Sequence, residues 1–175
     1  MLQKPLSLLI LMGAAIGLFI GILDSIFHFI NFEGYRLVNV IVFLVFFISV
    51  YWSVIVYRDK IHNGIITYGR AFRNTIVIGI VAAFIIAAIR FLFLEFVVNI
   101  DINSILDETR VAMTEQAGNY TDEQISNRLS FIEFSYNPFI SSILYFNYYL
   151  LFVIVFTFFA SFLIKRVDRN ISLEF

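Results

Sequence analysis

The amino-acid sequence predicts an all-α, polytopic membrane protein with four transmembrane helices. Four apolar stretches cover about 6–30, 37–57, 75–98 and 139–164, and each has the length of roughly 20 residues or more that spans a bilayer as a helix. Hydrophobic residues make up 61% of the chain, and its mean hydropathy is +0.90. A soluble domain carries more charge and less apolar surface. We therefore expect residues 1–175 to form a single integral membrane domain.

The first apolar stretch follows Lys4 and Pro5, and proline is tolerated in the first turn of a helix. This stretch is longer than the apolar region of a typical signal peptide. It also lacks a convincing small-x-small cleavage site before Asp24. We therefore expect it to be retained as the first transmembrane helix.

The second span follows a short polar link at 31–34, so the first two spans are expected to form an antiparallel hairpin. Tyr51 and Trp52, and then Tyr57 and Arg58, close this span. Aromatic and basic side chains of this kind anchor helices at the membrane–water interface.

The link at 59–72 joins the second span to the third. It contains the turn pair Asn63-Gly64, and the residues that follow are too apolar for a free loop. We expect a segment that lies in the interface and runs into the third helix. Arg70 and Arg73 would then lie at headgroup depth, either as ordinary anchors or as a site that attracts anionic lipid.

The segment 99–137 is polar, with seven acidic and two basic residues. Helical spacing of its apolar residues predicts two short amphipathic helices, and Thr121 with Gln124 fits a capping box at the start of the second. We expect both helices to lie on the outer membrane surface or to cap the bundle. Asn137-Pro138 supplies an N-cap and a first-turn proline for the last span.

Residues Asn63-Gly64-Ile65-Ile66-Thr67-Tyr68-Gly69-Arg70-Ala71-Phe72 lead into the third span. This motif, with the four-span layout and the long polar segment, resembles a family of uncharacterised bacterial four-span integral membrane proteins that is defined as a domain of unknown function. The resemblance extends over nearly the whole chain. It implies a bacterial cytoplasmic (inner) membrane protein and supplies no activity, ligand or catalytic residue.

Basic residues predict how the chain is threaded. With a cytoplasmic N-terminus, eight basic residues lie in inner segments and three in outer segments, and an excess on the inside is the usual pattern. The inner residues are Lys4, Arg58, Lys60, Arg70, Arg73, Lys165, Arg166 and Arg169, and the outer ones are Arg36, Arg110 and Arg128. Both termini are therefore expected in the cytoplasm.

Small residues recur at every fourth position in the first and third spans, a pattern that lets helix backbones approach closely. The two stripes are Gly13, Gly17 and Gly21 in the first span, and Gly79, Ala83 and Ala87 in the third. One offset of 66 positions relates the stripes and also relates Asp24 to Arg90. We predict that the two helices pack through these stripes and that Asp24 pairs with Arg90. The alternatives are that the two charges extend separately to the interface and that the glycine stripe mediates homodimerisation.

A candidate polar cluster comprises Asp24, His28, Arg90 and Asn147. Charged groups inside a span are costly and are normally paired or face a wet cavity. His28 lies four residues after Asp24, on the same helix face. The cluster is interpreted either as a site for a small ligand, ion or proton, or as structural contact between helices.

Several classes of function find no support in the sequence. Cysteine is absent and histidine occurs twice, at His28 and His62, on opposite sides of the predicted membrane. No catalytic, cofactor-binding or metal-binding signature is present, and a net charge of −1 argues against a nucleic-acid partner. No enzyme activity is expected.

The predicted function is that of a non-enzymatic accessory, scaffold or assembly partner. The alternative is a subunit of an oligomeric small-solute or ion transporter or channel, since four helices are few for a transport path in one copy. The expected partners are the lipid bilayer and either a second copy or another membrane protein.

Overall fold

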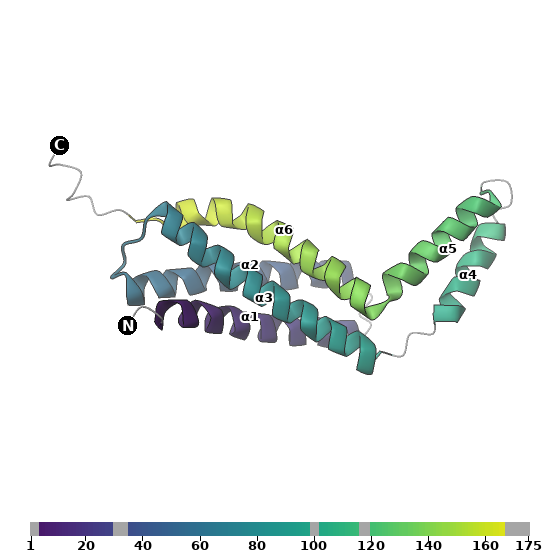
Figure 1. Ribbon diagram of the computed structural model, residues 1–175, viewed down its shortest axis with the longest axis horizontal. Helices are drawn as coiled ribbons and strands as arrows, with labels where there is room; N and C mark the ends of the chain where they lie inside the picture. The colour runs from purple at the N-terminus through teal and green to yellow at the C-terminus, as the bar shows by residue number, and fades with distance from the viewer. Residues whose placement is uncertain (1–3, 30–34, 99–101, 116–119, 167–175) are drawn as a thin grey trace.

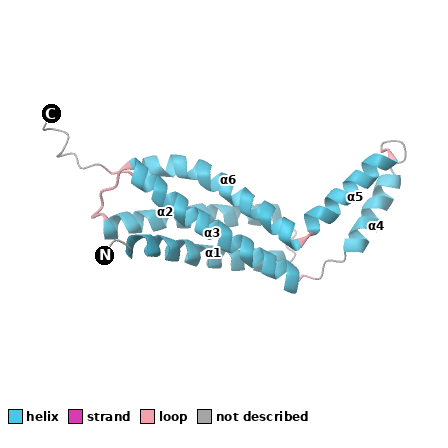
Figure 2. Cartoon of the chain, viewed as in Figure 1, coloured by secondary structure: helices cyan, strands magenta, loops and turns pink. Residues whose placement is uncertain are grey.

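A computed structural model describes residues 4–29, 35–98, 102–115 and 120–166, which fold into six helices (Figures 1 and 2). The helices are α1 (Lys4–Phe29), α2 (Tyr35–Ile61), α3 (Tyr68–Phe96), α4 (Ile102–Glu115), α5 (Asp122–Tyr136) and α6 (Pro138–Ile164). Four of them, α1, α2, α3 and α6, are long and apolar enough to cross a membrane. The predicted all-α, multi-pass fold is confirmed, with its shorter helices between the third and fourth spans.

The bundle is built around α3, which packs along α1 on one side and along α6 on the other, while α2 packs mainly on α1. The end at which α1 and α3 finish is called the hairpin end, because α4 and α5 follow there (Figure 1). The opposite end is called the tail end. Because successive spans run antiparallel, α1 and α3 begin at the tail end, and α2 and α6 begin at the hairpin end.

At the tail end, the motif before the third span is more ordered than an interfacial loop. Asn63 and Gly64 both have positive φ, 49° and 83°, and form the tight turn after α2. Ile66 then makes two backbone hydrogen bonds of 3.0 Å with Arg166. The third helix begins at Tyr68, so the expected interfacial segment is short and largely becomes the first turns of α3.

The buried core lies where the four spans meet, and it is rich in residues with little or no exposed surface, such as Ile20, Phe46, Ile78 and Ile86. The outward faces of the same helices are also apolar: Phe159 is 64% exposed and Leu163 is 73% exposed. A helix that is apolar all round suits a bilayer, where every backbone polar group is satisfied within the helix.

The polar segment forms two helices as expected, and one of the two expected placements, a cap on the bundle, is not found. α4 and α5 pack against each other as a hairpin that extends away from the bundle beyond the ends of the spans (Figure 1). None of the residues described in α4 or α5 is buried. The hairpin therefore does not cap the bundle, and its placement on the outer membrane surface stays a prediction.

Two short sequence signals set the beginning of α5 and of α6, and both are confirmed. The Gln124 backbone N–H donates to Thr121 Oγ1 at 3.3 Å, and the Thr121 N–H donates to Gln124 Oε1 at 2.9 Å. Asn137 Oδ1 accepts from the N–H groups of Phe139 and Ile140. The capping box and the Asn-Pro start thus satisfy backbone donors that a helix leaves unpaired.

Candidate functional site at the hairpin end

The glycine stripe of α1 lies directly against α3. A Cβ atom added to Gly13 would lie 2.7 Å from the Ile78 carbonyl oxygen, and one added to Gly17 would lie 2.8 Å from the Ala82 carbonyl oxygen. At Gly21 the added atom would lie 2.7 Å from Ile89 Cδ1. The two helices approach this closely because α1 has no side chains there. This line of contact between α1 and α3, called the α1–α3 seam, ends near Asp24, one turn further along α1.

The small residues of α3 do not all meet this stripe. A Cβ atom added to Gly79 would lie 2.5 Å from Val153 Cγ1, so Gly79 faces α6 and not α1. Ala83 and Ala87 follow it at four-residue spacing and are also buried. The predicted pairing of the two stripes therefore fails at Gly79. The physical reason is the central position of α3, which needs a close-packing surface on two sides.

At the end of the α1–α3 seam, the structure brings Asp24 and Arg90 together. Arg90 Nη1 lies 3.6 Å from Asp24 Oδ2, and the two side chains are 16% and 5% exposed, respectively. The guanidinium carbon of Arg90 lies 4.3 Å from the centre of the Tyr145 ring on α6. An arginine over an aromatic face is further stabilised by the negative face of the ring. Three spans thus meet at one buried charge pair.

Tyr145 is the member of this cluster that sequence reasoning missed. It hydrogen-bonds Asp24 and also the fully buried Tyr149, one turn along α6. A carboxylate only accepts hydrogen bonds. In the hydrogen bond between Tyr145 and Asp24, the Tyr145 hydroxyl is therefore the donor and the carboxylate is the acceptor. The four-residue spacing of the two tyrosines was the available signal, because it places both on one face of the last span.

His28 and Asn147 differ in their relation to the ion pair. His28 is within electrostatic reach of Asp24, and its ring packs on Phe93 with 5.8 Å between centroids. Asn147 is exposed and does not join the cluster. It lies two positions from both Tyr145 and Tyr149. Two residues correspond to about 200° of rotation in a helix, so Asn147 faces the opposite side of α6.

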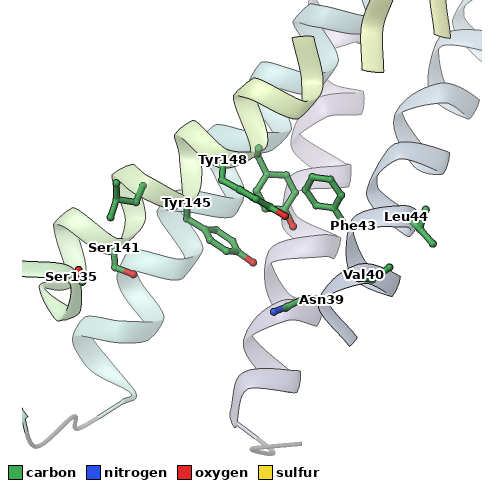
Figure 3. A pocket seen from close by; sticks show the side chains of 10 residues that line it. Asn39, Val40, Phe43, Leu44, Ser135, Ser141, Tyr145 and Tyr148 are labelled. Carbon is green, nitrogen blue, oxygen red and sulfur yellow. The ribbon is translucent and has the colours of Figure 1, made fainter. Parts of the chain in front are cut away.

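Next to the ion pair lies a cavity of about 600 Å³ between α2 and α6, which Ser135 of α5 also lines. Figure 3 shows the side chains of Asn39 and Tyr145 pointing into this space from opposite sides. Tyr145 thus lines the cavity and also contacts Arg90 of the ion pair. The lining residues are Asn39, Val40, Phe43, Leu44, Ser135, Ser141, Leu144, Tyr145, Tyr148 and Tyr149.

The side chains at this end offer hydrogen bonding and a neutralised charge pair. Within the described ranges, no three or more His, Asp or Glu residues gather in a way that could hold a metal ion. His62 lies at the other end of the bundle, where its ring packs on Tyr57 at 5.6 Å.

The comparisons with known proteins give a family and no activity. A family model described as "Protein of unknown function (DUF4199)" matches residues 8–166. The match includes the motif before the third span and extends over all four spans. No curated protein and no solved structure matches the chain.

Proposed function

Because this chain belongs to the DUF4199 family of proteins of unknown function, as its motif and layout predicted, we propose a role from its own geometry. The protein is a non-enzymatic accessory or assembly partner of another membrane protein. It contacts that partner through the α4–α5 hairpin. We further propose that it resides in the bacterial cytoplasmic membrane with both termini inside, which is supported by the excess of basic residues in the inner segments.

The observation that carries this proposal is the exposed apolar surface of the hairpin. Phe131 and Phe134 of α5 are 61% and 54% exposed, and Val111 of α4 is 53% exposed. The two phenylalanines are three residues apart, so they are neighbours on one helix face. Outside the hydrocarbon region, water faces these rings unless a partner covers them, and aromatic residues are enriched at protein interfaces.

The charge of the hairpin favours a protein over a lipid surface as the partner. The described hairpin residues include six acidic and two basic side chains: Asp107, Glu108, Glu115, Asp122, Glu123 and Glu133, with Arg110 and Arg128. Anionic lipid attracts basic segments and repels acidic ones. The expected partner therefore presents an apolar patch with basic residues around it.

The double variant Phe131→Ser with Phe134→Ser is expected to lose the partner without losing the fold. Both rings are exposed, so the free energy of unfolding should change by no more than about 0.5 kcal/mol. The measurement is affinity purification from native membranes in mild detergent, with mass spectrometry of the co-purifying proteins. The wild type should retain a stoichiometric heterologous protein that the variant loses.

A matched control for this experiment is Asn127→Ser with Ser130→Ala, which alters exposed polar residues of the same helix. This control should retain the partner. Equal recovery of the partner with the phenylalanine variant would contradict the proposal, and so would equal loss with the control.

The cavity favours a second candidate, a subunit of an oligomeric small-solute or ion transporter or channel. A transport path through this protein needs more than one copy, because four spans enclose little space. The support for it is the proximity of the cavity to the Asp24–Arg90 pair. A homo-oligomer without a heterologous partner in the same purification would move the balance to this candidate.

A further inference from the structure

We propose that the cavity between α2 and α6 binds a lipid-soluble quinone, that is, a neutral flat ring with carbonyl oxygens on an apolar tail. One residue of α5, Ser135, lines this cavity, and no other residue described in the α4–α5 hairpin does. Its volume of about 600 Å³ lies within the range of roughly 300–1,000 Å³ that is typical of small-molecule sites. The size therefore admits a substituted ring and the first part of a tail.

The lining of the cavity selects a neutral head. The ten described residues that line it include an amide, hydroxyl groups and apolar side chains, and none of the ten carries a formal charge. A charged phosphate or ammonium head would lose its hydration there without a counter-charge. Asn39 and Ser141 instead offer N–H and O–H groups that can donate to carbonyl oxygens. Phospholipid heads are thereby disfavoured.

The walls of the cavity select a flat head. Phe43 of α2 packs on Tyr148 and Tyr149 of α6, with 5.3 Å between ring centroids in each case. Aromatic rings favour stacked or edge-on contact with another ring. The ring cluster thus forms a floor against which a planar head can pack, while a branched or flexible head would fill it poorly.

The rim of the cavity leads into the bilayer. Val40 and Leu44 on α2 and Leu144 on α6 are 57%, 55% and 51% exposed, and all three lie on membrane spans. On α2 the lining residues lie roughly 6–14 Å along the axis from the first residue of the helix, at 1.5 Å per residue. This depth corresponds to the outer part of the hydrocarbon core. A ligand therefore reaches the cavity sideways from the lipid, with its tail along the exposed aliphatic surface.

The test is photolabelling of the purified full-length protein in mild detergent with an azidoquinone that carries a decyl tail. Mass spectrometry should place the saturable adducts in residues 39–44 and 141–149. An excess of a decyl-tailed benzoquinone should abolish labelling, and decylbenzene, which has the same tail and a ring without carbonyl oxygens, should not. Adducts elsewhere, labelling without saturation, or equal competition by decylbenzene would overturn the proposal.

Two variants identify the contacts. Asn39→Leu removes the amide at nearly constant size and should weaken quinone binding about tenfold, the loss of one hydrogen bond at its upper range. Asn147→Leu makes the same change on the exposed side of α6 and should bind like the wild type. Leu144→Trp fills the rim at an exposed position and should reduce labelling even if Asn39→Leu does not fold. Unchanged affinity in both cavity variants would refute the assignment.

Discussion

Replacing Asp24 with alanine is expected to lower the free energy of unfolding by about 3–5 kcal/mol, the cost of breaking a buried ion pair by removing one partner. Arg90 would keep its charge at a position where its side chain is 16% exposed. Tyr145 would also lose the carboxylate that accepts its hydrogen bond. The measurement is thermal or chemical unfolding of the purified protein in detergent, followed by circular dichroism.

Two controls separate this effect from general damage to the helix. Glu95→Ala removes an exposed carboxylate near the same end of α3 and should change the stability by no more than about 0.5 kcal/mol. The single charge reversals Asp24→Arg and Arg90→Asp should each be strongly destabilising, and the double reversal should recover much of the loss. A double reversal as unstable as the single variants would show that the two groups do not pair directly.

The substitution Gly17→Ala is also expected to have a large effect. It should lower the free energy of unfolding by about 1–3 kcal/mol, as overpacking does in a well-packed core. The new Cβ atom would lie 2.8 Å from both the Ala82 carbonyl oxygen and Ile85 Cβ. In an exposed helix the same change is stabilising, since glycine is the poorer helix former. The sign of the effect therefore reports the close approach of α1 and α3.

The other glycines supply graded controls for that measurement. Gly69 has no atom within 4 Å of an added Cβ, so Gly69→Ala should be neutral or slightly stabilising. At Gly79 the obstacle is the Val153 side chain, and Val153→Ala should therefore partly rescue Gly79→Ala. Equal stability of the Gly17 and Gly69 variants would contradict the packing of α1 on α3.

The membrane fold was predictable because a bilayer imposes simple requirements. A span needs about 20 apolar residues and must satisfy its own backbone, and the four long stretches meet both conditions. Helix starts were predictable for a similar reason, since the Thr121 capping box and the Asn137 cap act within a few residues of chain. These signals depend on neighbours in sequence, so no tertiary information is required.

The sequence does not determine which neighbouring helix each face of a span contacts. Gly79 and Gly17 look alike in a four-residue pattern, yet one contacts α6 and the other contacts α3. Asp24 and Arg90 were predicted to pair because an unpaired charge inside a membrane span is costly. Tyr145 and the exclusion of Asn147 follow from the rotation of α6 about its axis, and an almost uniformly apolar helix gives little information on that rotation.

Site-specific photocrosslinking in native membranes shows whether the α4–α5 hairpin contacts another protein. Benzoylphenylalanine replaces Phe131 in one variant and the lipid-facing Phe159, which is 64% exposed, in a control. Position 131 should crosslink to one heterologous protein of defined mass, and position 159 should not. Crosslinks from position 131 only to lipid or to a second copy of this chain would contradict it.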